Sequence, residues 1–89
     1  MKNAIDVKDP RRSQLVRVTV DGWDVGVGIL DSLERITWTN LDGEVTIFES
    51  FGEFVEEVRR SNIVRYDWRI AVKPVNSVLW NIVQEGDVE

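Results

Sequence analysis

Apolar and polar residues alternate from residue 15 to residue 20, the pattern of a half-buried β-strand. Asp21-Gly22 follows directly, and this dipeptide is typical of a two-residue hairpin turn, because a type I′ turn needs positive φ at both central positions. We therefore predict a hairpin of residues 15–20 and 23–29 in which Val18 lies opposite Val25, so that the valines of both strands share one face.

The second strand of this hairpin has glycines on the face opposite its valines. Gly26 and Gly28 leave that face nearly bare, although strands normally avoid glycine. The predicted register places Arg17 opposite Gly26 and Leu15 opposite Gly28 on the side away from the core. We expect a partner, or the stem of Arg17, to lie close against the bare face. Gly26→Val should then leave the sheet intact and weaken partner binding.

Two further alternating runs, residues 35–40 and 44–49, surround a second turn at Asp42-Gly43. We predict a register in which Trp38 lies opposite Ile47, both toward the core. The opposite, outward face would then carry four large apolar side chains that can form an exposed interface patch. These are Leu15, Leu30, Leu41 and Phe48.

A helix is predicted to follow. Ser50-Phe-Gly-Glu53 matches the capping box, in which the serine oxygen accepts from the N3 amide and the glutamate reaches back to the cap amide. Apolar residues then recur with helical spacing up to Val58, and the remaining positions are glutamates and arginines. The acidic face of this helix is a second candidate interaction surface.

The last third of the chain predicts one more strand and a short C-terminal helix. Residues 64–72 alternate again and end at Pro74, with no indication of which strand they join. Apolar residues between 75 and 83 follow the helical spacing, and a β-strand over 77–83 is the alternative, because that run is short and rich in valine.

The predicted fold class is α+β: a four-stranded antiparallel meander, a helix, a fifth strand and a short C-terminal helix, with a single layer of helix on sheet. The 89 residues suffice for one domain, which we place at 14–86. We expect 1–13 to be a flexible arm and 87–89 a frayed tail. Residues 15–20 are expected to form an exposed sheet edge, which makes a homodimer a candidate assembly.

The amino-acid composition limits the kinds of functional site that the chain can form. The chain has no cysteine and no histidine, which removes disulfides, thiolate metal sites and the commonest general base. The serines therefore have no histidine to activate them, and the carboxylates at the hairpin turns are accounted for by turn geometry. We expect no enzyme activity, no cofactor and no metal.

The net charge of −5 argues against binding along a phosphate backbone, and no apolar run approaches the ~20 residues of a membrane span. The first twelve residues contain no hydrophobic stretch like that of a signal peptide. We expect a cytoplasmic protein, in the host cytoplasm if a phage encodes it.

This small, acidic profile without a catalytic motif resembles the accessory inhibitors that bacteriophages encode against host machinery, including anti-CRISPR proteins. The likeness is one of size and composition and assigns no residues. It implies a non-catalytic protein-binding module that occludes a surface of a larger host complex. The candidate partner-binding residues, chosen from the sequence, are Leu15, Arg17, Asp24, Gly26, Gly28, Phe48, Glu53, Glu56 and Glu57.

The alternative is a small nucleic-acid-binding domain that uses the outer sheet face. Basic residues at outward strand positions would meet phosphates, and Phe48 would stack on a base. The basic residues are Arg17, Arg65, Arg69 and Lys73.

Overall fold

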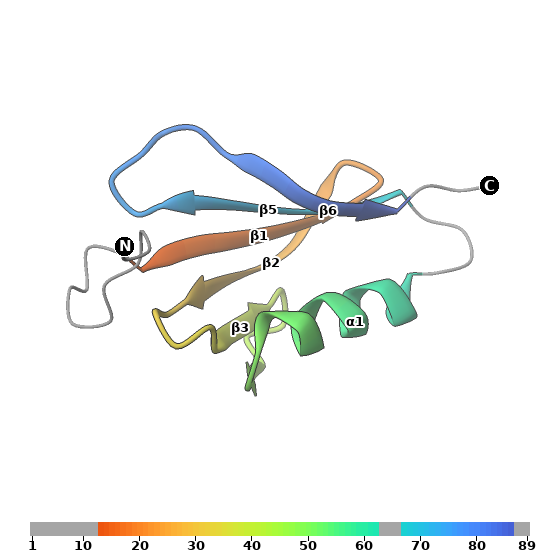
Figure 1. Ribbon diagram of the computed structural model, residues 1–89. Helices are drawn as coiled ribbons and strands as arrows, with labels where there is room; N and C mark the ends of the chain where they lie inside the picture. Colours follow the sequence, from red (N-terminus) through yellow and green to blue (C-terminus); the bar gives the residue numbers. More distant parts are fainter. Residues whose placement is uncertain (1–12, 63–66, 87–89) are drawn as a thin grey trace.

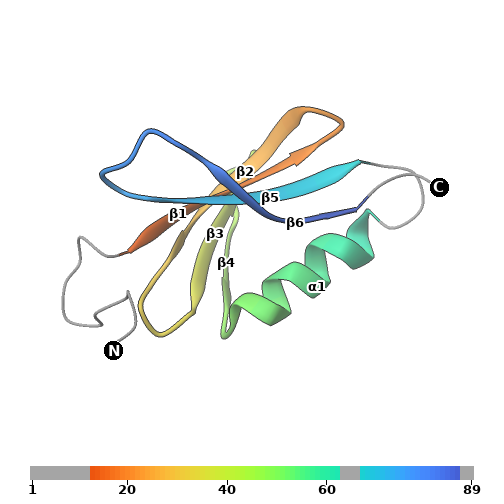
Figure 2. The same ribbon diagram turned by 45° about the horizontal axis from the view of Figure 1, so that its top comes forward.

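Six strands form one antiparallel sheet in the order β4-β3-β2-β1-β5-β6 in this computed structural model, which describes residues 13–62 and 67–86. The single helix of the described residues lies against one face, and no described helix or strand packs on the other (Figures 1 and 2). We call the face toward the helix the inner face and the opposite one the outer face. The elements are β1 (Gln14–Val20), β2 (Trp23–Leu30), β3 (Ile36–Asn40), β4 (Val45–Phe48), α1 (Phe51–Ser61), β5 (Trp68–Pro74) and β6 (Asn81–Gly86).

The predicted turn between β1 and β2 is confirmed. Asp21 and Gly22 have φ of 52° and 86°, the positive values that a type I′ turn requires. Val20 pairs with Trp23 across it, as expected. Local turn chemistry therefore fixes where this hairpin reverses.

The predicted register beyond the turn is wrong by one residue. A β-bulge between Val18 and Thr19 of the β1 ladder leaves Val25 as the extra residue of β2, so that Val18 pairs with Gly26 and not with Val25. Because a shift of one residue exchanges the two faces, Gly26 lies on the inner face with Val18, and Val27 lies on the outer face.

The inner-face glycines make room for the indole of Trp38. A Cβ added to Gly26 would lie 2.6 Å from the carbonyl oxygen of Thr39 and 2.8 Å from Trp38 Cη2. One added to Gly28 would lie 3.2 Å from Trp38 Cε3. The bare strand face is therefore covered from inside the molecule by a neighbouring side chain, and it does not await a partner.

The second predicted register is also wrong by one residue. The β3–β4 hairpin closes at Asn40, whose N–H donates to the carbonyl of Glu44 (3.0 Å), around a three-residue loop that ends at Gly43 with φ 84°. Trp38 thus pairs with Thr46 instead of Ile47, and Phe48 faces inward.

The core lies between α1 and the inner face. Phe54 of α1 is 1% exposed, and its ring centroid lies 5.1 Å from that of Trp38 and 5.4 Å from that of Phe48. These contacts favour the observed register, which turns Phe48 and Thr46 inward in place of Ile47 and Val45 and sets the Phe48 ring against Phe54. The buried cluster consists of Val16, Val18, Ile36, Phe54, Val58, Trp68 and Ile70.

The helix begins as predicted. Ser50 is the N-cap, and its Oγ accepts from the N–H of Glu53 at 3.1 Å. The carboxylate of Glu53 reaches back one residue further than expected, to the N–H of Glu49 at 3.3 Å. No helix in the described part of the chain is long and apolar enough to span a membrane.

The predicted C-terminal helix is wrong, and residues 81–86 form β6. This strand pairs antiparallel with β5, which offers a long free edge, and the β-branched pair Ile82-Val83 suits a strand. Val78, at the centre of the predicted helix, is 87% exposed in the β5–β6 connection. The alternative prediction of a β-strand over 77–83 is therefore correct for residues 81–83.

β5 pairs antiparallel with β1, which lies in the middle of the sheet. The expectation that residues 15–20 form an exposed edge is therefore wrong, and the two edges are β4 and β6. Among the other predictions, the tail, nearly all of the N-terminal arm, the beginning of the fifth strand and Arg65 lie outside the described residues.

Candidate functional site

The outer face carries a block of β-branched side chains across three strands. Val45, Thr39 and Val27 lie side by side on β4, β3 and β2, and Ile47, Thr37 and Ile29 form the next row. We call these six residues the β-branched block. Its four aliphatic side chains are half to three-fifths exposed, from 51% to 61%. A continuous patch of this kind is characteristic of an interaction surface.

The block continues onto β1 and β5. Leu15 pairs with Ile29, and Arg17 pairs with Val27, so both lie next to the block on the same face. Ala71 of β5 follows beside Arg17 and is 9% exposed. The side chains on the outer face are thus all apolar on β4, whereas β5 carries both apolar and charged ones.

An open groove of about 460 Å³ lies where the block meets β1. Among its lining residues, Arg17 Nε donates to Asp24 Oδ1 at 2.7 Å. The ring of Trp80, from the β5–β6 connection, has its centroid 5.6 Å from Arg17 Cζ and 5.5 Å from Lys73 Nζ. The lining residues are Arg17, Asp24, Gly26, Val27, Thr39, Asn40, Leu41 and Trp80.

The cations of this face are engaged within the chain. Besides the Arg17–Asp24 pair, Arg69 Nε lies 3.6 Å from Glu85 Oε1 on the neighbouring strand. Lys73 Nζ donates to the carbonyl oxygen of Ser77 at 2.6 Å, which holds the β5–β6 connection near the sheet. The outer face therefore presents apolar area with its charges largely compensated.

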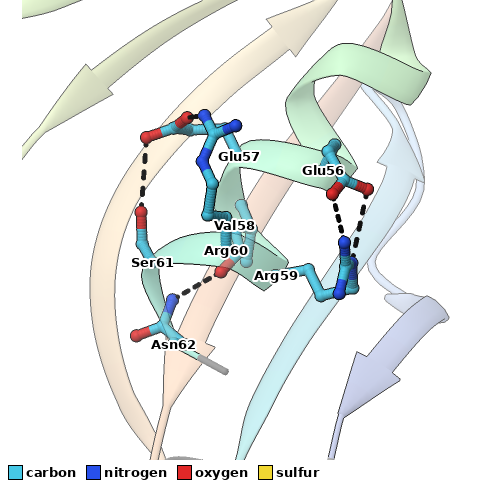
Figure 3. A network of polar contacts seen from close by, with 7 residues as sticks. All are labelled: Glu56, Glu57, Val58, Arg59, Arg60, Ser61 and Asn62. Carbon is cyan, nitrogen blue, oxygen red and sulfur yellow. Dashed lines mark hydrogen bonds and ion pairs between the residues drawn. The ribbon is translucent and has the colours of Figure 1, made fainter. Parts of the chain in front are cut away.

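Two of the three glutamates on the acidic helix face are compensated as well. Glu56 pairs with Arg59 and Glu57 with Arg60 along α1, and Ser61 Oγ donates to Glu57 at 3.3 Å (Figure 3). The hydrogen bond from Arg59 holds the pKa of Glu56 below its usual value. Exposed pairs of this spacing stabilise a helix modestly and leave no row of free carboxylates.

The nine partner-binding candidates chosen from the sequence do not form one site. Leu15, Arg17 and Asp24 lie on the outer face, as expected. Three others, which were also placed there, lie on the inner face, and the remaining three are on the helix. The inner-face residues are Gly26, Gly28 and Phe48, and the helical ones are Glu53, Glu56 and Glu57.

The predicted apolar patch divides in the same way. Leu15 and Leu41 belong to the outer side, and Leu41 is 74% exposed at the rim of the groove. Leu30 pairs with Ile36 and packs against the core. The aliphatic residues of the block were missed because each lies on a strand whose register was off by one. The large aromatic side chain of Phe48 could have indicated the correct register of the second hairpin, since burying it turns Val45 and Ile47 outward.

No group of three acidic residues in the described ranges lies close enough together to hold a metal ion. Comparison with protein-family models, with curated proteins and with solved structures finds no match to this chain.

Proposed function

We propose that this chain is a non-catalytic protein-binding module and that its contact surface is the outer face of the sheet. The β-branched block carries the proposal. Full burial of one valine or isoleucine side chain contributes about 1.5–3 kcal/mol, so covering four that are about half exposed contributes roughly 3–6 kcal/mol. A flat row of aliphatic groups offers few directional contacts to a small polar ligand and suits another protein surface.

Occlusion is the mode of action that fits this surface. A module that covers part of a larger protein needs contact area and no reactive group, in agreement with the inhibitor role that the sequence profile implies. The groove between Trp80 and Leu41 adds a concave site next to the flat block. Large side chains of a partner would enter such a site, because interface energy concentrates in anchor residues that fill pockets.

Nucleic-acid binding has less support. The guanidinium groups of Arg17 and Arg69 already donate to, or lie close to, carboxylates. Phe48, the residue expected to stack on a base, packs against Phe54 on the inner face. A sheet-face reader of RNA or single-stranded DNA relies on exposed aromatic rings and unpaired cations.

Site-specific photo-crosslinking in the cells that produce the protein tests the proposal. A photoreactive phenylalanine analogue replaces Val27 or, separately, Ile47, both in the block. As controls it replaces Leu33 or Val78, which are 61% and 87% exposed and lie in loops. We expect covalent adducts with a polypeptide chain from the block positions only. Equal yields at block and loop positions would overturn the proposal.

A further inference from the structure

We propose that the occupant of the outer face is a second copy of this chain, packed face to face so that the two sheets form a sandwich with one helix on each outside. The inference rests on the proposed function, because it uses the same surface, and it names the partner. Side chains of two packed sheets interdigitate across about 10 Å, and β-branched residues suit such a layer.

The small size of the core favours a second copy. The buried cluster holds seven residues, all between α1 and the inner face, and the chain has no cysteine to cross-link it. Sheets bury both faces when a second layer is available, and small domains commonly gain stability from oligomerisation. A second copy supplies the missing layer permanently, whereas a transient partner would leave the face exposed most of the time.

The area of the outer face can be compared with the area that a stable dimer buries. Six strands about 4.8 Å apart, with an average length of roughly 20 Å, give a face of roughly 500 Å² in projection. The relief of the side chains raises the accessible area above this value, and Trp80 and Leu41 add to it at the groove. Stable interfaces begin at about 600 Å² per partner, so a dimer would use nearly the whole outer face.

The charges of the outer face are compatible with packing against a second copy. A two-fold dimer brings each patch against itself, so an unpaired charge on the face would meet its own copy. The block contains no charged residue, and the neighbouring Arg17 and Arg69 are matched by Asp24 and Glu85 of the same chain. Lys73, whose ammonium donates to the Ser77 carbonyl and not to a carboxylate, is a further described cation of this face. The net charge of −5 therefore does not arise from this face, and with the uncharged block at the two-fold axis no charge meets its own copy.

Light scattering on the purified full chain tests the dimer. We expect a molar mass of twice 10.3 kDa at high micromolar concentration. Val27→Glu and Ile47→Glu should each halve this mass, because the dimer would bury an unpaired carboxylate. Val78→Glu makes the same change at a position that is 87% exposed outside the block, and it should leave the dimer intact. Circular dichroism of each variant verifies that the sheet has formed.

A monomeric mass for the unmodified chain overturns the dimer, as does a dimer that survives both block substitutions. The photo-crosslinked protein gives a readout that needs no destabilising variant: an adduct of twice the chain mass from position 27 supports the second copy. An adduct of any other mass, with a monomeric pure protein, overturns the dimer and leaves the proposed function standing. A monomer without block-specific adducts overturns both.

Discussion

Gly26 is a residue whose role in the fold can be tested directly. Because a Cβ there would lie 2.6 Å from the Thr39 carbonyl oxygen and 2.8 Å from Trp38 Cη2, Gly26→Ala should lower the free energy of unfolding by about 1–3 kcal/mol. Gly52→Ala is the matched control, since its Cβ would lie 3.8 Å from Ser50 Oγ, and alanine favours a helix. Urea denaturation compares the two. If the Gly26→Ala and Gly52→Ala variants were equally stable, Trp38 would not occupy the space above Gly26.

Asp31 is a second single residue with a testable role, because it makes the stability of the fold depend on pH. Partial desolvation raises the pKa of Asp31. Hydrogen bonds from the N–H groups of Arg35 (3.0 Å) and Leu33 (2.8 Å) and from the Arg35 side chain outweigh this effect, so that the pKa lies below its usual value. The ionised Asp31 therefore adds to the free energy of unfolding. This stabilisation is fully present above the unfolded-state pKa of about 3.9 and is lost as pH falls through the lower folded pKa.

The variant Asp31→Asn separates titration from hydrogen bonding. Its amide oxygen still accepts from the backbone, but it does not ionise. We expect the stability difference between the unmodified chain and this variant to be below about 1 kcal/mol at neutral pH, because the Asp31 side chain is 36% exposed, and to shrink below pH 4. Denaturation midpoints measured from neutral to acidic pH check this. A difference that grows on acidification would contradict it.

At the scale of elements, the N-cap of α1 can be removed without touching the core. Ser50→Ala deletes the acceptor for the Glu53 N–H and should cost about 1 kcal/mol. Ser50→Asp keeps an acceptor oxygen at the helix N-terminus and should retain most of the stability. Chemical denaturation ranks the three proteins, and an alanine variant as stable as the aspartate one would mean that the cap contributes nothing.

The sequence predicts element starts and turns well because those signals are local. Asp21-Gly22 and the cap at Ser50 each depend on a few adjacent residues. Registers depend on distant partners: the bulge at Val25 is favoured because it places Gly26 beneath Trp38, which lies on the neighbouring strand. The same holds for β6, where pairing with β5 outweighs a helical spacing. Of the candidate site, Leu15, Arg17 and Asp24 were predictable, and the block was not.

For the whole molecule, a dimer links stability to concentration. If two copies share the outer face, unfolding also separates them, and the midpoint of thermal unfolding should rise by several degrees across a hundredfold increase in protein concentration. Val27→Glu should abolish this rise, whereas Val78→Glu should preserve it. Scanning calorimetry over a dilution series measures both. A midpoint that is independent of concentration in the unmodified chain contradicts the linkage.

The central position of β1 affects how the chain is made. β2 follows β1 at once, but β5, its other neighbour, is synthesised roughly 50 residues later, which takes about 3–10 s at 5–20 residues per second. During that interval the edge of β1 that later pairs with β5 has no strand beside it, and such edges recruit other chains. Translation is therefore a stage at which the chain can aggregate through an edge that the folded sheet keeps paired.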